Sequence, residues 1–191
     1  MIYTPTDDFY VQRLEITNIK ESRFDFLATL CKDKKVMHIG CAEVPTYRKD
    51  SNLHIALSKL SNLHGMDINM EGIQALQKDC PGTYYTSFEE IKERYDMVLV
   101  PEVMEHVLNV GLFLQDIFSI QSKEYFITAP SINNGQIICL DTYCIEGIHP
   151  DHKYWFSPYT LYNVVKPFSG GYQMKLYYLE NRSQVGIWLY K

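Results

Sequence analysis

Residues 95–107 constrain the fold more than any other part of the sequence. The stretch begins with an apolar run at 97–100 that offers no polar face, which is typical of a parallel strand buried on both sides. Pro101 interrupts this run, and residues with helical spacing follow it. The stretch therefore predicts a strand that passes directly into a helix, which is the repeating unit of open α/β sheets.

Three side chains that can bind protons or metal ions follow this strand. Glu102, Glu105 and His106 stand at i, i+3 and i+4, so a helix that begins near Pro101 would project all three from one face. Open α/β sheets bind ligands at the carboxyl ends of their strands, where this face would lie. The cluster is either such a site or an ordinary first turn, in which the helix dipole favours acidic residues.

The same alternation of strand and helix continues along most of the chain. Hydrophobic periodicity predicts strands near 36–39, 64–69, 83–86, 95–100 and 125–129, and then a hairpin of 174–179 with 184–190. Helices are predicted at 48–60, 70–78, 112–120 and 157–166. The pattern indicates an α/β, Rossmann-like, doubly wound fold with a mostly parallel seven-stranded sheet and a C-terminal antiparallel hairpin. Its first and fourth strands are expected to be neighbours, which would place Gly40, Asp67 and Glu102 around one cleft.

The length predicts one domain. The chain has 191 residues, and domains commonly hold roughly 100–200, so we expect a single domain over 1–191. Residues 1–33 are expected to form an N-terminal helical flank, because apolar residues recur at helical spacing between 6 and 30. Residues 133–154 fit neither period and are expected to form an irregular loop at the active site.

Composition argues against several classes of partner. The net charge of −5 and the pI near 5.7 give no electrostatic reason for a long nucleic acid or an anionic membrane. No stretch approaches the ~18 uninterrupted apolar residues of a membrane span, and the polar N-terminus does not resemble an export signal. The five cysteines are odd in number and contain no C-x-x-C pair, which disfavours a disulfide framework and a zinc knuckle. We therefore expect a cytoplasmic protein.

Several motifs in order carry a resemblance to a known family. They are V-M-H-I-G-C-A, G-M-D-I-N, Y-D-M-V-L-V-P-E-V-M-E-H-V, F-I-T-A-P-S and H-P-D-H-K-Y-W-F-S. Across 36–161 the chain resembles the class I S-adenosylmethionine-dependent methyltransferases. It is most similar to the small methyltransferase domains found with glycan-assembly glycosyltransferases, which implies an association with glycosyltransferase machinery.

The resemblance implies S-adenosyl-L-methionine as cofactor and places its first binding turn at 38–42. His38 stands where an acid is common in the family, Gly40 is the one glycine kept, and Cys41 and Ala42 complete the turn. An ordinary strand-to-helix turn that binds nothing is the alternative. Dinucleotide binding is disfavoured, because Glu43 occupies the place where phosphates would lie.

The remaining cofactor contacts are implied by position. Asp67 matches the ribose-binding acid of the family, and a carboxylate can accept hydrogen bonds from both ribose hydroxyls. Ile68 follows it, Phe88 falls with Thr86 and Ser87 where the family encloses adenine, and Pro101 would face the methionine moiety. The alternatives are a loop aspartate that caps the next helix and a plain core phenylalanine.

E-x-x-E-H also resembles the metal-binding motif of ubiquinone-biosynthesis O-methyltransferases and of small-RNA 2′-O-methyltransferases. The latter take another histidine from a later segment, which is D-H-K-Y here, and the implied metal ligands are Glu102, Glu105, His106 and His152. Mg²⁺, Mn²⁺, Co²⁺ or Zn²⁺ would suit this set and could chelate a vicinal diol. The alternative is a metal-free site in which His106, His149 or His152 acts as general base.

The resulting hypothesis is an O-methyltransferase that acts on a sugar hydroxyl of a saccharide or glycan acceptor. Trp155 and Phe156 could line the acceptor pocket or simply anchor the core, whereas His54 and His64 are expected to be surface or helix histidines. A small-RNA terminal 2′-O-methyltransferase is one alternative, although the chain lacks a basic run. A non-catalytic Rossmann-like binding module is the other.

Overall fold

A parallel three-stranded unit lies at the centre of the molecule. The computed structural model describes residues 13–43, 48–134, 137–140, 142 and 144–191. Strand β5 (Tyr95–Pro101) pairs in parallel with β2 (Lys35–Ile39) on one side and with β6 (Ser122–Pro130) on the other. The predicted adjacency of the first and fourth strands of the core is thus confirmed.

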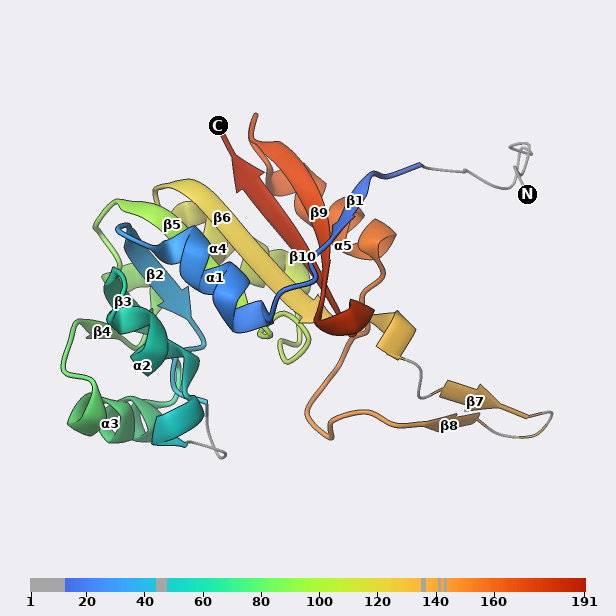
Figure 1. The fold of residues 1–191 in the computed structure, drawn as a ribbon, viewed down its shortest axis with the longest axis horizontal. Coiled ribbons are helices and arrows are strands. Elements are labelled where there is room, and N and C mark those ends of the chain that lie inside the picture. The colour runs from blue at the N-terminus through green and yellow to red at the C-terminus, as the bar shows by residue number, and fades with distance from the viewer. Residues whose placement is uncertain (1–12, 44–47, 135–136, 141, 143) are drawn as a thin grey trace.

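In the described part of the chain, the main sheet has eight strands in the order β1-β9-β10-β6-β5-β2-β3-β4 (Figure 1). Strand β10 runs antiparallel to both of its neighbours, and every other pairing in this sheet is parallel. The mostly parallel α/β sheet and the C-terminal antiparallel hairpin are therefore confirmed. The remaining strands are β1 (Ile16–Asn18), β3 (Asn62–Met66), β4 (Tyr84–Tyr85), β9 (Gln173–Leu179) and β10 (Gln184–Tyr190).

The eighth strand comes from the N-terminal segment, where a continuous helix over 6–30 was predicted. Residues 1–12 lie outside the described part of the chain. Within it, β1 pairs with β9, and the helix α1 starts only at Arg23 and ends at Cys31. Ser22 fixes this start because its hydroxyl accepts a hydrogen bond from the Asp25 amide. The prediction was wrong for β1 because its edge position, with only one partner strand, leaves little hydrophobic pattern to read.

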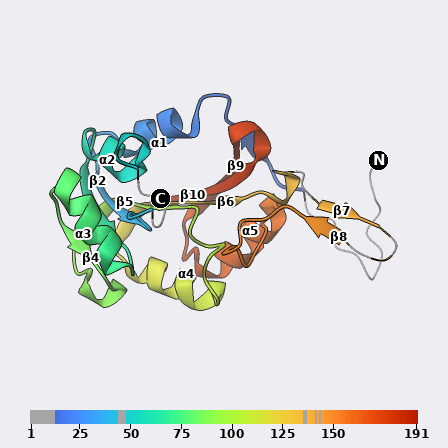
Figure 2. The same ribbon diagram turned by 90° about the horizontal axis from the view of Figure 1, so that it is seen from below.

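Helices cover both faces of the sheet, which gives the three-layer arrangement of a doubly wound fold. Figure 2 shows α1 and α2 (Leu53–Ser58) on one face and α4 (Val110–Ser119) and α5 (Pro158–Val165) on the other. The predicted helix at 48–60 is shorter than expected because Asn52 caps α2 and only a 3₁₀ turn, Lys49–Ser51, precedes it. Asn69 and Ser157 cap α3 (Met70–Asp79) and α5 as predicted.

Strand β5 contributes side chains to two separate cores. Val98 and Val100 pack in the cluster shared with α4 and α5, whereas Met97 and Leu99 pack in the cluster shared with α1 and α2. All four side chains are fully buried. This period of two explains why the run at 97–100 is apolar without interruption.

The segment after β5 is not the helix that the spacing predicted. Glu102 has a positive φ of 55°, residues 104–106 form a turn, and the next helix starts after the cap Asn109. The Glu102 amide instead donates to the carbonyl and to the hydroxyl oxygen of Thr128, at 3.1 and 3.2 Å. A left-handed residue cannot begin a right-handed helix, so the expected shared helical face of Glu102, Glu105 and His106 does not exist.

The loop predicted at 133–154 has more structure than expected. It holds a 3₁₀ turn, Ile132–Asn134, and an antiparallel hairpin of β7 (Ile137–Cys139) with β8 (Cys144–Glu146), which Figure 1 shows extending away from the main sheet. Residues 135, 136, 141 and 143 lie outside the described part. The chain then returns to the sheet, where the Lys153 amide donates to the Glu105 carbonyl at 2.6 Å.

Candidate functional site

The site lies where the carboxyl ends of β2, β3 and β5 meet. Chain order runs from β2 outward through β3 to β4, and then in the opposite direction from β5 to β6. The strand order therefore reverses between β2 and β5, which is where open α/β sheets bind ligands. Gly40, Asp67 and Glu102 directly follow the three strands that meet there.

The turn after β2 is tightly held. Gly40 has a φ of +77°, and a Cβ atom at this position would lie 2.5 Å from Cγ2 of Val103. Its amide donates to the Met66 carbonyl at 2.8 Å. Cys41 and Ala42 are fully buried, and burial raises the pKa of the Cys41 thiol, which remains protonated. The turn therefore offers backbone rather than reactive side chains.

Asp67 joins this turn to the next helix. One carboxylate oxygen accepts a hydrogen bond from the Ala42 amide at 3.0 Å, and the other accepts one from the Asn69 amide at 2.9 Å. The carboxylate is only partly buried, and each oxygen has a second lone pair that can accept another donor. Asp67 thus bridges the two loops and still has capacity for a ligand, whereas the cap of α3 is Asn69 and not, as one alternative had it, Asp67.

The other predicted cofactor residues differ in exposure. Ile68 is 86% exposed next to Asp67, so its apolar side chain has no protein cover. Phe88 packs edge-to-face against Phe113, with 6.1 Å between the ring centroids, and belongs to the core on that face. Pro101 is buried at the end of β5.

His38 does not face solvent beside the turn. Its ring stacks on that of His54 from α2, with 3.1 Å between the two Nδ1 atoms. Burial lowers the pKa of both imidazoles, for His54 to about 4, so both rings are neutral near pH 7. His54 lies in a helix as expected, but His54 and His64 are both buried. The expectation of a surface or helix position therefore holds for His54 and was wrong for His64, which is buried in β3.

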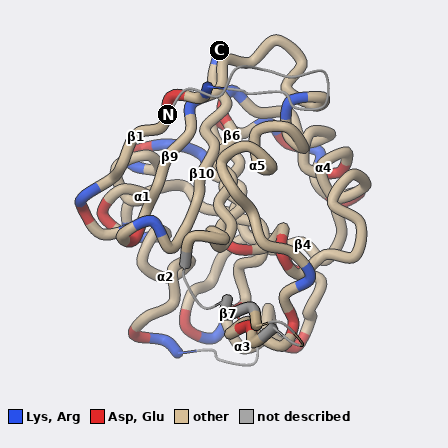
Figure 3. Tube along the Cα trace, turned by 90° about the vertical axis from the view of Figure 1, so that its right-hand side faces the viewer, with Lys and Arg blue, Asp and Glu red and all other residues tan. Residues whose placement is uncertain are grey.

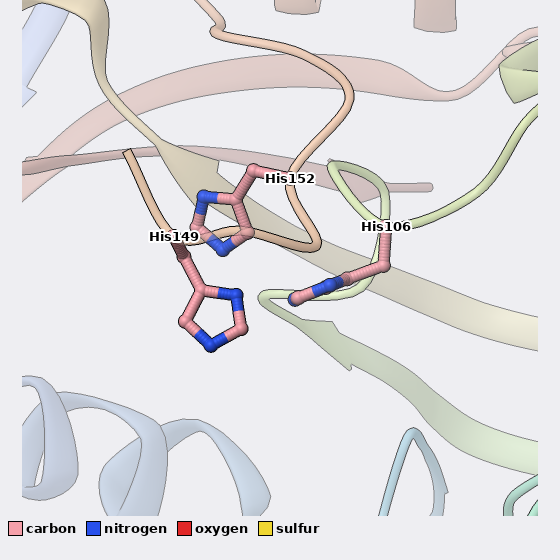
Figure 4. A group of neighbouring side chains, drawn as sticks. All are labelled: His106, His149 and His152. Carbon is pink, nitrogen blue, oxygen red and sulfur yellow. The ribbon is translucent and has the colours of Figure 1, made fainter. Parts of the chain in front are cut away.

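The second part of the site is a group of three histidines. His106, His149 and His152 each offer a ring nitrogen, and these atoms lie within 4.8 Å of one another. Figure 4 shows His106 on the loop after β5 and the other two on the returning loop. The structure therefore brings together all three residues predicted as possible bases.

Glu105 lies beneath this group. Its carboxylate is completely buried, and neither oxygen has a hydrogen-bond partner among the described residues. Oε1 is 3.8 Å from Nε2 of His106 and 4.0 Å from Nε2 of His152. Burial, and next the nearby Glu102, raise the pKa of Glu105 to about 9. A buried carboxylate without hydrogen-bond donors is unusual in folded proteins, and a bound cation or an added donor would satisfy it.

Asp151 orients the group from the outside. Its carboxylate lies 3.0 Å from Nδ1 of His106, and its amide donates to Nδ1 of His149 at 3.3 Å. The ion pair with Lys153, and then the contact with His106, lower the pKa of Asp151. Burial and the two neighbouring imidazoles lower the pKa of His152, which is therefore neutral near pH 7. Sequence reasoning did not include Asp151, although it is part of the D-H-K-Y motif.

A cavity of about 280 Å³ opens beside the histidines. Its lining includes Glu102, His149, His152 and Trp155, together with Gln184 at the start of β10. The Glu102 carboxylate accepts a hydrogen bond from the Thr128 hydroxyl at 2.8 Å, and burial raises its pKa. Trp155 faces this cavity as one alternative predicted, whereas Phe156 is buried in the core. The Trp155 indole donates to Glu146 of β8.

Comparison with known proteins gives matches at the level of structure. No protein-family model matches the chain. No curated protein matches it either. The methyltransferase domain of bacterial CtHen1 aligns with a TM-score of 0.62 at 13% identity, over 89% of this chain and 98% of that chain. The chain that aligns in the Pnkp1/Rnl/Hen1 RNA repair complex has a TM-score of 0.62 at 14% identity, and only 40% of it is covered.

Magnesium protoporphyrin IX methyltransferase from Synechocystis PCC 6803, solved with bound SAH, also aligns, with a TM-score of 0.58 at 14% identity over 88% of this chain and 82% of that one. At such low identities, the structural alignments show a shared fold. Within the described residues, no helix is both long and apolar enough to cross a membrane. The structural alignments, taken together with the strand order, show that the chain has the Rossmann-like fold of the S-adenosylmethionine-dependent methyltransferases.

Proposed function

We propose that this chain is an S-adenosylmethionine-dependent O-methyltransferase that acts on a sugar hydroxyl of a glycan. The observation that carries the proposal is the Glu105 carboxylate, which is buried without a hydrogen bond beneath His106 and His152. These groups lie at the carboxyl edge of the sheet that also holds Gly40 and Asp67. A cofactor turn and a proton-accepting group thus share one edge of a methyltransferase fold.

The cofactor fits the first part of the site. Asp67 has lone pairs left for ribose hydroxyls after its two backbone contacts. Ile68 offers an exposed apolar face on which adenine could pack. The amides of the 40–42 turn are already hydrogen-bonded to Met66 and Asp67, so this turn would offer its carbonyl oxygens to the ammonium group of the amino-acid moiety. When bound, adenosylmethionine would supply an electrophilic sulfonium methyl group for transfer to an acceptor oxygen.

A divalent ion fits the second part. The orphaned oxygens of Glu105 need a positive charge or donors, and the imidazoles of His106 and His152 bind metals in their neutral form. Of the four ligands that the sequence motifs predict, Glu105, His106 and His152 lie together, whereas Glu102 lines the cavity beside them. When bound, the ion would supply a Lewis acid that lowers the pKa of an acceptor hydroxyl.

The chain's own residues supply positioning and proton transfer. The neutral imidazole of His152 can take the proton of the acceptor hydroxyl. Asp151 fixes the ring of His106 through Nδ1. The Trp155 indole forms one wall of the cavity and could stack on the apolar face of a sugar ring.

A terminal ribose of small RNA is the second candidate acceptor, because it also carries a vicinal diol. The alignment with CtHen1 and with a chain of an RNA repair complex favours it. The charge of −5 does not. Figure 3 shows acidic and basic residues interspersed along the described chain rather than gathered in one basic face. We therefore place the saccharide acceptor first.

The decisive experiment offers the chain adenosylmethionine with a panel of free sugars, glycosides and short RNAs, and measures the mass gain of one methylene group. We expect a gain on saccharides that carry a vicinal diol, and its loss in His152→Asn. A gain on RNA alone would move the assignment to the second candidate. If calorimetry shows no heat with millimolar adenosylmethionine, the enzyme proposal fails and a non-catalytic binding module takes its place.

A further inference from the structure

The geometry points to a three-histidine metal centre of His106, His149 and His152, selective for Zn²⁺, Co²⁺ or Ni²⁺ over Mg²⁺, in which His149 takes the place expected for Glu102. This inference deepens the proposed function, because it specifies the ion class at the same site. The three ring nitrogens already lie within 4.8 Å of one another.

His149 belongs to the group by position. Its ring centroid is 5.8 Å from that of His106 and 5.0 Å from that of His152 (Figure 4). The ring is exposed, and the hydrogen bond that it accepts from the Asp151 amide is long, at 3.3 Å. It can therefore turn toward an ion with little resistance from the surrounding protein.

Glu102 is hydrogen-bonded to Thr128 through both its side chain and its amide. Its carboxylate accepts a hydrogen bond from the Thr128 hydroxyl, and its amide donates to the same residue. Its φ of 55° breaks the helix that would have placed it on one face with Glu105 and His106. A ligand role for Glu102 would therefore compete with the hydrogen bond that its carboxylate accepts from Thr128.

Two further contacts are typical of metal sites. The Asp151 carboxylate binds Nδ1 of His106 at 3.0 Å, which leaves Nε2 as the electron-pair donor, as in carboxylate–histidine–metal arrangements. Nε2 of His106 and Nε2 of His152 both face the unpartnered, fully buried Oε1 of Glu105. The anionic form of Glu105 would balance the charge of the ion beneath the three imidazoles.

The ligand type decides which ions fit. Imidazole nitrogen suits zinc and the later transition metals, whereas magnesium prefers oxygen ligands and retains its water. Three protein ligands also leave positions open, as in catalytic zinc sites. A vicinal diol of an acceptor could occupy such positions.

The test uses the tag-free chain, stripped of metal by a chelator, with neither cofactor nor acceptor present. Co²⁺ is titrated by its visible absorption, and Mg²⁺ is then added as competitor. We expect one Co²⁺ per chain, no displacement by equimolar Mg²⁺, and an affinity lowered by more than about tenfold in His149→Ala. Glu102→Gln is the comparison variant, because the sequence motifs predict Glu102 as a ligand; it should change the affinity less than about twofold if the three histidines hold the ion. Circular dichroism checks that each variant is folded.

Three results would overturn the inference: no Co²⁺ binding in the wild-type chain, displacement by equimolar Mg²⁺, or a loss of affinity in Glu102→Gln with none in His149→Ala. Because the titration contains no cofactor, its outcome is separate from that of the proposed function. A chain that binds Co²⁺ as expected yet transfers no methyl group would refute only the proposed function. A chain that methylates saccharides but binds no Co²⁺ would refute only the metal centre.

Discussion

The two parts of the site satisfy their carboxylates in opposite ways. At the turn after β2, both oxygens of Asp67 accept backbone hydrogen bonds. Beneath the histidines, both oxygens of Glu105 are buried without a donor. The chain itself supplies hydrogen-bond donors to both oxygens of Asp67, whereas the Glu105 carboxylate requires a proton or a cation from outside. The comparison teaches that the turn after β2 is preorganised by its own hydrogen bonds and that the state of the histidine group depends on what it binds.

The largest expected effect is a loss of stability at alkaline pH in the metal-free chain. The pKa of Glu105 lies at about 9 in the folded state, above its ordinary value of 4.5, so the folded chain holds a proton that the unfolded chain releases. Stability must therefore fall as the pH rises through this window. The full penalty is about 3–5 kcal/mol, which is typical of an uncompensated buried charge.

Melting temperatures at pH 7, 8 and 9 in chelator test this, at roughly 2–4 °C for each kcal/mol. The wild-type chain should lose stability across the series, and Glu105→Gln should not. In acid the buried imidazoles act in the opposite direction: the pKa of His54 is lowered from 6.5 to about 4, so its contribution is lost as the pH falls below 6.5. Parallel curves for the two chains above pH 7 would show that Glu105 is already ionised and paired.

The second effect concerns Asp67, whose two carboxylate oxygens both accept backbone hydrogen bonds. Asp67→Ala should weaken adenosylmethionine binding by about 1.5–3 kcal/mol, the range for hydrogen bonds to a charged acceptor. Calorimetry measures the affinity, and Asp96→Ala is the control, because that carboxylate binds Lys35 and Lys123 instead. Unchanged affinity in a folded Asp67→Ala chain would refute the ribose assignment.

A third prediction tests the tightness of the first turn. Gly40 and Gly171 both have positive φ, but an added Cβ would clash with Val103 only at Gly40 and would meet nothing within 4 Å at Gly171. Gly40→Ala should therefore destabilise the chain by about 1–3 kcal/mol more than Gly171→Ala, the range for overpacking. Urea unfolding gives both values, and Val103→Ala should recover most of the difference. Equal losses would mean that the turn can shift freely.

The smallest effect is expected from the contact between Asp151 and His106. Asp151→Asn keeps the shape of the side chain but removes the charge that orients His106. Co²⁺ affinity should fall about tenfold, the lower end of the range for such partners, whereas adenosylmethionine affinity should not change. A loss of both affinities would mean that the two parts of the site are not independent.

Much of the fold could be predicted from the sequence because it depends on long apolar runs. The strand at 95–100 and the final hairpin are buried by period-two patterns that few other structures could satisfy. The short edge strand β1 and the hairpin of β7 with β8 were missed because their stability depends on neighbours rather than on local pattern.

Several residues that the sequence singled out as a site lie near one another in the structure, but not in the predicted arrangement. The spacing of Glu102, Glu105 and His106 suggested a helix, but the contact between Glu102 and Thr128, 26 residues later, fixes a left-handed residue instead. The burial of His38 against His54 was also beyond the sequence, since it depends on how α2 packs on β2. Local patterns carry residue types, whereas long-range contacts decide which of those residues meet.

The pairing of β1 with β9 has a consequence for how the chain folds. Ile16 lies opposite Leu176 in a parallel register, so these strands are separated by nearly the whole sequence. A ribosome would release β1 long before its partner exists, and closing so long a loop is entropically slow. The sheet edge at β1 should therefore form last, and a nascent chain that stops before residue 173 would leave β1 unpaired.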